Sequence, residues 1–498
     1  MKSLKIYQYC LIMLAALGLF SSCEKALNEQ PYSQLSDDQF WKTNADAEGG
    51  VIGIYDAMQK HYASRQFLWG EFRGDSYIRT TLATGTNLEL TTNTLTANNA
   101  AVVRWNNLYQ MIGRANLAIE KIPKITGYDK NLLAEAYLAR AYAYFDAVRV
   151  WGGVPVFKEA ITGLDQELVR PRTDGQTIMN EIVIPDMLEA EKLMSRTTNT
   201  YRFSKMSVYA FQGTVYMHQK KYPEAKAALD KIVNSKLYTL TTTRDAWDKM
   251  FLNDPNLGGK FMTGTELIFT IKYSLTEDAD RSGIYNIFFA GIPSFNIAPA
   301  LENKWIAYFP TDSVKWVAKY PAAADLPKTK NPDGTTLWGD WRYFDSKEAG
   351  RVIGSARVAK YNKININGSF DDSDIHIYRY ANIILLLAEA ENKLWKVSGL
   401  AANKTAAVNL VNQIRVARQL PQVKAADFTT ADQLEDFILD ERQMELLAEG
   451  HRWWDLVRTD KAVKVMGPIN GQTEKSIVFP IFQGHLITNP LLKQNEGY

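Results

Sequence analysis

The sequence predicts a mainly α fold, in which paired helices occupy the first and last thirds of the chain and a loop-rich insertion lies between them. Two observations support this prediction. Apolar residues recur at helical spacing in the first and last thirds of the chain, whereas residues 235–375 are rich in Thr, Asn, Gly, Pro and aromatic side chains. No Pro/Ser-rich linker divides the chain, so we expect one compact domain over residues 23–498.

The first third of the chain alternates helical periodicity with one polar stretch. Helical spacing begins near Asp37, where Ser36 is suited to cap a helix. Residues 63–100 lose that spacing, and we expect loops there with a short hairpin. The pattern returns over Val102–Ile122 and again over Lys130–Trp151, which is apolar on nearly every side and therefore expected to be buried.

Residues 173–194 and 205–234 predict three more helices, and the second segment carries a pattern of its own. Small and aromatic residues stand where a tetratricopeptide unit has them, at Tyr209, Gly213, Tyr216, Ala225 and Leu229. Small residues let paired helices approach closely while aromatic rings fill the gaps. Gln212 and Ile232 depart from the pattern and no clean repeat series follows, so we expect a single degenerate unit.

The remainder of the chain is predicted in three parts. A strand-like piece, ELIFTIKY, lies at 266–273 inside the loop-rich insertion of residues 236–375. Helices return at Tyr378–Trp395, Lys404–Gln419 and Ala431–Arg458, and the tail of residues 476–498 is extended and broken by proline. The helical scaffold is thus expected over residues 36–235 and 376–460.

The N-terminus carries an export signal over residues 1–22. Lys2 and Lys5 precede the apolar run of residues 10–20, which is too short to span a membrane, and two serines lead to Cys23. A cysteine directly after small residues predicts a lipoprotein, in which this thiol is acylated and the chain is anchored to a membrane. The alternative is an ordinary signal peptide with an incidental cysteine. Residues 24–35 are polar and are expected to form a tether.

Composition excludes several functional classes. The formal charge is +2, and removal of Lys2 and Lys5 with the signal brings it near zero, so nothing favours nucleic-acid binding. The two cysteines are Cys10 and Cys23. Because the first leaves with the signal and the second carries lipid, no disulfide, cysteine-based metal site or cysteine nucleophile is expected.

Motifs for catalysis or metal binding are missing from the sequence. The histidines do not pair as HxxxH or HxH, and the nucleophile and phosphate-loop motifs are absent. The run DDSD at 371–374 lacks the remaining calcium-loop ligands, and a solvated acidic turn is the stronger interpretation. The charged stretch Glu441–Arg458 is either a catalytic acid patch or, as we favour, a structural clamp between the last helix and the core. We therefore expect no enzyme and no cofactor. The alternative is a secreted hydrolase that uses a pair of carboxylates.

Several motifs in order resemble the SusD/RagB family of outer-membrane lipoproteins. They are the lipidated Cys23 followed by FWKTNADAEGGVIGIYDAM (40–58), WNNLYQMIGRANLAIEKI (105–122), ARAYAYFDAVRVWGGVPV (139–156), YRYANIILLLAEAEN (378–392), ERQMELLAEGHRWWDLVR (441–458) and FPIFQGHLITNPLLKQNEGY (479–498). The family's usual FPIP is FPIF here, with Phe482 in place of a proline. The resemblance runs nearly end to end.

The resemblance implies both architecture and function. It implies a tetratricopeptide-type helical scaffold with an irregular half packed on it. It also implies a cell-surface protein in the outer membrane that captures oligosaccharides and delivers them to a TonB-dependent transporter of the SusC type, acting as a lid without catalysis. A binder of peptide or glycoprotein-derived nutrient in the same kind of complex is the alternative.

Sugar capture needs aromatic faces for pyranose C–H groups and polar side chains for hydroxyls, carried on loops. Two stretches meet these requirements, residues 66–99 and the middle insertion. The turn-forming residues 331–334 are expected to present Trp338 and Trp341 at a loop tip. The candidate ligand-binding residues are Trp69, Asp75, Arg79, Asn98, Tyr285, Phe288, Phe289, Phe295, Trp338 and Trp341. Packing of each aromatic within a loop core is the alternative for this set.

Overall fold

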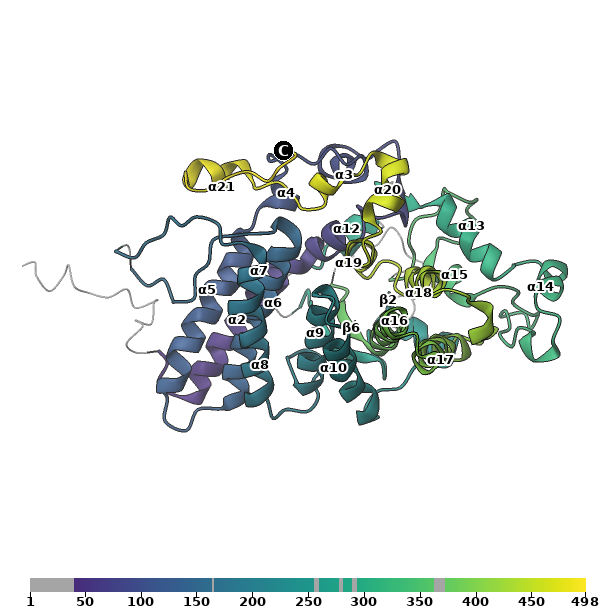
Figure 1. Ribbon diagram of the computed structural model, residues 1–498, viewed down its shortest axis with the longest axis horizontal. Helices are drawn as coiled ribbons and strands as arrows, with labels where there is room; N and C mark the ends of the chain where they lie inside the picture. Colours follow the sequence, from purple (N-terminus) through teal and green to yellow (C-terminus); the bar gives the residue numbers. More distant parts are fainter. Residues whose placement is uncertain (1–39, 164, 255–258, 277–280, 289–292, 362–371) are drawn as a thin grey trace, which may run out of the picture.

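The computed structural model describes residues 40–163, 165–254, 259–276, 281–288, 293–361 and 372–498. An array of helices runs through it, each packed on the next (Figure 1). Its members are α2 (Asn44–Gly70), α5 (Asn106–Lys121), α6 (Lys130–Trp151), α8 (Ile184–Leu193), α9 (Lys205–His218), α10 (Tyr222–Ser235), α16 (Tyr380–Ser398), α17 (Ala401–Ala417) and α18 (Ala431–Glu445). The mainly α, tetratricopeptide-like scaffold is therefore confirmed.

Helix α6 shows how local signals set an element that tertiary packing then buries. It begins and ends at the predicted residues. Asp129 caps its start by accepting the Asn131 N–H at 2.8 Å, and Gly152 ends it with a φ of 77°, a conformation that favours glycine. Most of its side chains are buried against α5 and α8, which explains why the segment is apolar on almost every side.

The tetratricopeptide-like unit of α9 and α10 is also confirmed. Ser204 caps α9 in a reciprocal capping box with Ser207. A Cβ atom built on Gly213 would lie 2.4 Å from Cδ2 of Leu229, so only glycine permits this approach of the two helices. The small residue at this position therefore has the packing role that the sequence pattern indicates.

Residues 63–103 are more ordered than predicted. Helix α2 continues to Gly70 because Phe67, Leu68 and Trp69 are buried in the core. Strand β1 (Tyr77–Arg79), α3 (Gly85–Thr91) and α4 (Ala100–Val103) follow where loops were expected. The predicted helix from Val102 instead starts at Asn106, because the backbone breaks at Arg104 and the Trp105 N–H donates to Nε2 of His485 at 3.2 Å.

The middle insertion holds short elements connected by irregular segments. The helices are α11 (Arg244–Lys249), α12 (Ile284–Phe288), α13 (Pro299–Tyr308), α14 (Ser313–Lys319) and α15 (Trp341–Ser346). The strands are β2 (Asn253–Asp254), β3 (Gly259–Lys260), β4 (Leu267–Ile271) and β5 (Phe295–Ile297). The predicted strand at 266–273 is confirmed as β4, which pairs antiparallel with β6 (Ile375–Arg379) just before α16. The region contains more helix than expected.

The predicted helix Ala431–Arg458 is two helices. Helix α18 ends at Glu445 and α19 begins at Arg452, with Ala448 and Gly450 at positive φ between them. The reason lies in α2, because a Cβ atom on Gly70 would lie 1.9 Å from the Gly450 carbonyl oxygen. This close approach of two backbones requires the turn and cannot accommodate a continuous helix.

The C-terminal tail forms short helices across the top of the molecule in Figure 1. They are α20 (Ala462–Asn470) and α21 (Gln483–Thr488), and only α21 lies in the segment 476–498 that was predicted to be extended. Phe482 precedes α21 with a φ of −56°, which is the value a proline would impose. Its ring accepts the Arg104 guanidinium at 4.9 Å, so the phenylalanine keeps the backbone of the usual proline and adds a contact.

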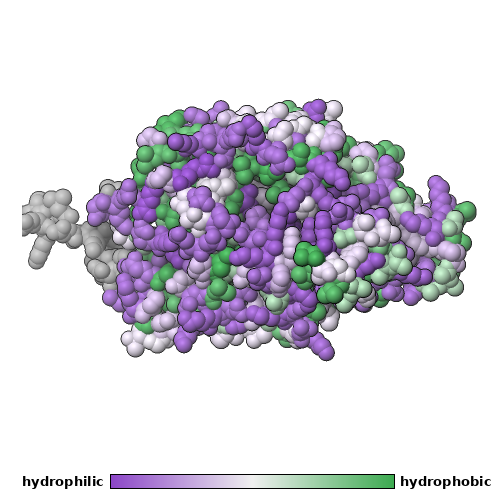
Figure 2. All heavy atoms as spheres, viewed as in Figure 1, coloured by the Kyte–Doolittle hydropathy of each residue, from purple (hydrophilic) through white to green (hydrophobic). Residues whose placement is uncertain are grey.

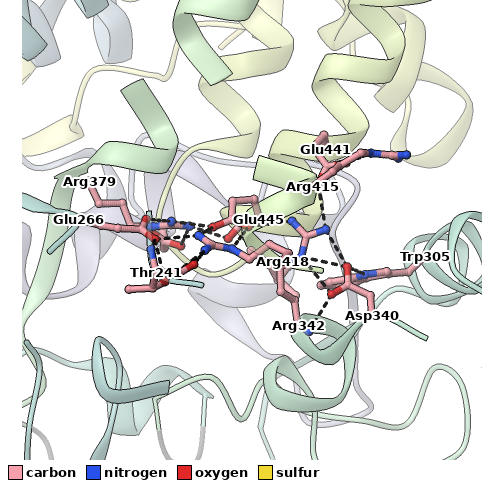
Figure 3. A network of polar contacts seen from close by, with 12 residues as sticks. Thr241, Glu266, Trp305, Asp340, Arg342, Arg379, Arg415, Arg418, Glu441 and Glu445 are labelled. Atoms are coloured by element: carbon pink, nitrogen blue, oxygen red, sulfur yellow. Dashed lines mark hydrogen bonds and ion pairs between the residues drawn. The ribbon is translucent and has the colours of Figure 1, made fainter. Parts of the chain in front are cut away.

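A buried ionic network joins the last helices to the middle insertion (Figure 3). The Glu445 carboxylate of α18 lies 2.7 Å from guanidinium nitrogens of Arg342, Arg379 and Arg418, and Glu441 lies 2.9 Å from Arg342. Burial alone would raise the pKa of Glu445, but the three arginines hold it well below its usual range. The structural clamp predicted for Glu441–Arg458 is confirmed.

Candidate functional site

The two stretches predicted to bind ligand meet at a small antiparallel sheet. Strand β1 pairs with β5 in the register Tyr77–Ile297, Ile78–Asn296 and Arg79–Phe295. The contact continues beyond the strands, because the Thr80 N–H donates to the Ser294 carbonyl at 2.9 Å. The sequence region 66–99 and the start of the middle insertion thus form one surface.

An aromatic cluster lies beneath this sheet. Phe72 stacks on Phe295 with ring centroids 3.8 Å apart, and Phe288 contacts both Phe72 and Tyr77. Phe288 and Phe295 are 1% and 2% exposed, so their faces are not accessible to a sugar. The prediction that these rings are displayed for ligand is wrong. They face inward because Phe67, Phe72, Tyr77 and Tyr361 supply an apolar environment for them.

The three tryptophans predicted to face the ligand are instead buried or half-buried in the core. Trp69 is buried in α2, where its Nε1 donates to the Val102 carbonyl at 2.9 Å. Trp341 is buried at the start of α15, and Trp338 is half-buried against Trp316. The expected loop tip fails because the exposed turn closes at the Lys330–Thr336 bridge, so the chain has already returned to the core at the tryptophans.

Of the polar candidates, one holds the fold together and two are exposed and free to contact a ligand. Asp75 holds Arg452 through contacts of 2.6 and 3.0 Å, and that guanidinium lowers the pKa of Asp75 against the opposing effect of burial. Its carboxylate is therefore committed to the fold. Arg79 and Asn98 are exposed, and neither side chain has an assigned hydrogen bond within the described residues. Tyr285 is half-buried, and Phe289 lies outside the described residues.

We define the β1–β5 surface by the exposed or half-exposed residues around the sheet. They are Ile78, Arg79, Leu82, Asn98, Asn296 and Val352. Asn98 is included because α3 joins its segment to β5: Thr86 donates to Asn99 at 3.1 Å, and Asn87 donates to Ser294 at 2.9 Å. The aliphatic members were missed by the sequence analysis, because an exposed isoleucine or valine carries no signal of its own. The burial pattern of β1, in which only Tyr77 is buried, depends on its pairing with β5, and Leu82 and Val352 lie outside any strand, so no local pattern could have found these residues.

A rigid turn flanks this surface. The Asn296 amide donates to the Gly354 carbonyl at 3.3 Å, which places the turn 352–355 beside β5. The buried Glu302 carboxylate fixes it by accepting from the Gly354 N–H at 2.7 Å and from Nζ of Lys347 at 2.6 Å. Val352 is 75% exposed at its tip. The surface is therefore held in shape without a ligand.

The described residues show no group of side chains that could hold a metal ion. Within them no three His, Cys, Asp or Glu side chains converge as metal ligands. Asp374, predicted to lie in a solvated turn, is buried and binds Nζ of Lys260 at 2.6 Å, while Asp371 lies outside the described residues. None of the helices that the structure describes has the length and apolar character required to cross a membrane. Figure 2 shows a largely polar face with separate apolar patches.

Comparison with known proteins decides the family. A model described as the SusD family matches residues 301–498, and one described as starch-binding associating with outer membrane matches residues 25–217. SusD-like protein P38 of Formosa agariphila is 45% identical over the full length of both chains. The chain belongs to the SusD family. SusD-like protein P2 of the same organism is 25% identical, again over all of both chains.

Solved SusD structures share this fold. A SusD-like protein from Bacteroides fragilis superposes with a TM-score of 0.71 at 17% identity, covering 94% of this chain and 100% of that one. A laminarin-binding SusD-like protein superposes with a TM-score of 0.67 at 20% identity, covering 92% and 100%. SusD-family proteins are carbohydrate-binding outer-membrane lipoproteins rather than enzymes, and they work with SusC-like transporters.

Proposed function

We propose that this SusD-family protein is a cell-surface lipoprotein that captures oligosaccharide and delivers it to a SusC-like TonB-dependent transporter. The observation that carries the proposal is the 45% identity to a SusD-like protein over the entire chain. The meeting of the two predicted stretches in the β1–β5 sheet supports the location of the site. Acylation of Cys23 and the polar tether of residues 24–35 are part of the same proposal.

The β1–β5 surface offers the groups that sugar recognition requires. Arg79 and Asn98 supply donors for hydroxyl oxygens, and the Asn98 amide oxygen accepts a hydroxyl proton. Ile78 and Leu82, which are 37% and 48% exposed, supply apolar contact for the C–H face of a ring. The turn at 352–355 is fixed by Glu302 and bonded to Asn296, so this flank of the surface is formed before a ligand binds, which lowers the entropic cost of binding.

Trp338 offers a second place for a ring to stack. It lies beyond the far end of α13, where Gly339 is close to Thr311, whereas β5 lies before the start of that helix. A ten-residue helix spans about 15 Å, so Trp338 is separate from the β1–β5 surface. A long oligosaccharide could contact both, and a short one could not.

Calorimetric titration with a panel of soluble polysaccharides tests the proposal, with laminarin in the panel because a SusD-like neighbour binds it. The Arg79→Ala, Asn98→Ala double variant should bind its glycan at least about tenfold more weakly. Lys315→Ala is the control, since Lys315 is exposed on α14 away from the sheet. Unchanged affinity in the double variant would refute the site, and no binding to any glycan would refute the function.

A peptide or glycoprotein-derived nutrient is the second candidate. The exposed aliphatic side chains Ile78, Leu82 and Val352 favour it, because they suit peptide side chains as well as sugar rings. Titration with peptide digests beside the polysaccharides separates the two candidates. Release of reducing ends by the purified protein would instead indicate a hydrolase, and we expect none.

A further inference from the structure

A groove of about 600 Å³ lies between α17 and the segment Tyr238–Thr242, away from every residue of the β1–β5 surface. It is open to solvent, and its volume falls within the range of about 300–1,000 Å³ typical of small-ligand sites. Two tyrosines, side-chain amides and small apolar groups line it. These are Tyr238, Thr239, Leu240, Thr242, Tyr380, Asn409, Asn412, Gln413, Val416, Ala417 and Gln422.

The tyrosines are the strongest indication of a ligand. Tyr238 and Tyr380 are each 8% exposed, with ring centroids 6.4 Å apart and planes inclined by 28°. Neither hydroxyl has an assigned hydrogen bond within the described part of the chain, although burial raises the pKa of both groups. Neither hydroxyl oxygen is among the described buried atoms that lack a partner, so both oxygens reach the groove, where they can donate to and accept from a ligand.

The opposite wall presents free amides. Asn409 and Gln413 lie four residues apart on α17, which places them on one face of the helix. Both are exposed, and neither side chain has an assigned partner among the residues described. Each amide can donate and accept, as can a tyrosine hydroxyl, and this matches the paired donor and acceptor character of sugar hydroxyls.

The groove is held rigid by the ionic network. Glu266 accepts from both the backbone N–H and the hydroxyl of Thr241 at 2.9 Å, and Arg418 donates to the Thr241 carbonyl (Figure 3). Gln419 donates to the Thr242 carbonyl at 3.2 Å. The wall therefore keeps its shape without ligand, which favours binding by a preformed site.

The charge of the groove selects the class of ligand. Its lining contains no Lys, Arg, His, Asp or Glu side chain. Arg418 and Glu266 behind the wall are already paired with each other at 2.9 Å. A sulfate or carboxylate group on a glycan would thus find no counter-charge in the lining. Neutral hydroxyls match the amides and phenols.

We propose that this groove is a second saccharide-binding site, which takes a segment of an uncharged glycan. Its residues are separate from the β1–β5 surface, so the proposal does not depend on that assignment. The tyrosine hydroxyls, Asn409 and Gln413 would bind the hydroxyls of the sugar, while the exposed Val416 would contact its ring.

The test uses calorimetry and hydrogen exchange on the mature chain with short neutral oligosaccharides of glucan, mannan and xylan type, and with oligogalacturonate as the charged probe. We expect at least one neutral probe to protect residues 238–242 and 405–423 from exchange. The Asn409→Ala, Gln413→Ala variant should lose this protection and bind about tenfold more weakly at this site. Tyr238→Phe and Tyr380→Phe should weaken binding without unfolding the chain. Thr405→Ala, exposed on α17 but outside the lining, is the control.

The outcomes separate the two sites. Arg79→Ala should leave protection of the groove intact, and the groove variant should leave the β1–β5 affinity intact. The proposal is overturned if no neutral probe protects the groove, if the amide variant binds as well as wild type, or if oligogalacturonate binds there as tightly. Protection of the groove by the transporter but by no sugar would also overturn it, since the groove would then be a docking surface.

Discussion

The buried Glu71 carboxyl group has hydrogen-bond partners on only one of its two oxygens among the described residues. Its Oε1 accepts the N–H groups of Gly450, Glu449 and His451 at 2.8, 3.1 and 3.3 Å, while Oε2 has no partner among the described residues. Burial raises the pKa of Glu71 to about 8, against the opposing effect of the three N–H groups. Near neutral pH the native state therefore holds a proton that the unfolded chain releases.

The Glu71→Gln variant tests this assignment. Because the native pKa exceeds the unfolded value, the contribution of Glu71 to stability is complete below about pH 4.5 and is lost as pH rises toward 8. The glutamine has no such loss, so the free energy of unfolding of the variant should rise by about 4 kcal/mol relative to that of wild type between pH 5 and pH 9. Urea denaturation at both pH values measures the difference. Parallel pH profiles for the two proteins would show that Glu71 is ionised in the native state.

Glu445 is the opposite case, a buried carboxylate with three guanidinium partners. Glu445→Gln removes the negative charge that Arg342, Arg379 and Arg418 share, and unfolding should become easier by about 3–5 kcal/mol. Asp432→Asn is the matched control, because its pair with Lys396 is exposed and should contribute less than about 1 kcal/mol. Chemical denaturation of both variants provides the measurement. A similar small effect in the two would contradict the clamp.

Residue identity alone predicted the two stretches that meet at the β1–β5 sheet, but it predicted neither which of their side chains lie there nor which way these face. The rings of Phe288 and Phe295 do reach the β1–β5 sheet, yet they pack on Phe72 below it. Their direction depends on partners from α2 and from residue 361, which are distant in sequence. Arg79 and Asn98 are at the surface as expected, because a polar side chain without a buried partner remains solvated.

At the scale of elements, the packing of α9 on α10 depends on a single missing side chain. Gly213→Ala would place a methyl group 2.4 Å from Leu229, so we expect the two helices to separate and stability to fall by about 1–3 kcal/mol. Gly113→Ala in α5 is the control, since no atom lies within 4 Å of its Cβ position and the added methyl should stabilise that helix by about 0.5–1 kcal/mol. Thermal denaturation distinguishes the two. A stabilising effect of both changes would mean that Leu229 moves aside at little cost.

The ends of a helix were predictable where signals in its own sequence set them. They were not predictable where contacts with residues distant in the sequence set them. Helix α6 has its cap, its periodicity and its terminal glycine in its own sequence, and both ends were predicted. The break after Glu445 depends instead on Gly70 meeting Gly450, two residues far apart in the chain. The start of α5 depends similarly on His485 in the tail, whose ring stacks on Trp105 at 4.6 Å. Local patterns contain no information on such contacts.

At the scale of the molecule, one apolar core connects the scaffold to the insertion. It includes Trp41 near the start of the described chain, Phe295 beneath the β1–β5 sheet and Leu492 in the tail. The loops that carry the proposed ligand-binding groups are thus attached to one continuous core. A protein built in this way can bind at the cell surface and move as one body, which suits a module attached by a tether.

The role of Cys23 can be tested on the whole protein. An acyl chain contributes about 0.8 kcal/mol of membrane binding for each buried CH₂, whereas the groups proposed to bind sugar are all beyond residue 70. Cys23→Ala should therefore release the protein from the outer membrane and impair glycan uptake, while the affinity of the purified chain stays within about twofold of wild type. Fractionation, growth on the glycan and calorimetry give the three readouts. Cys10→Ala is the control, because this residue lies in the signal and should leave anchoring intact. A loss of affinity together with anchoring would place Cys23 in the fold and contradict the lipoprotein assignment.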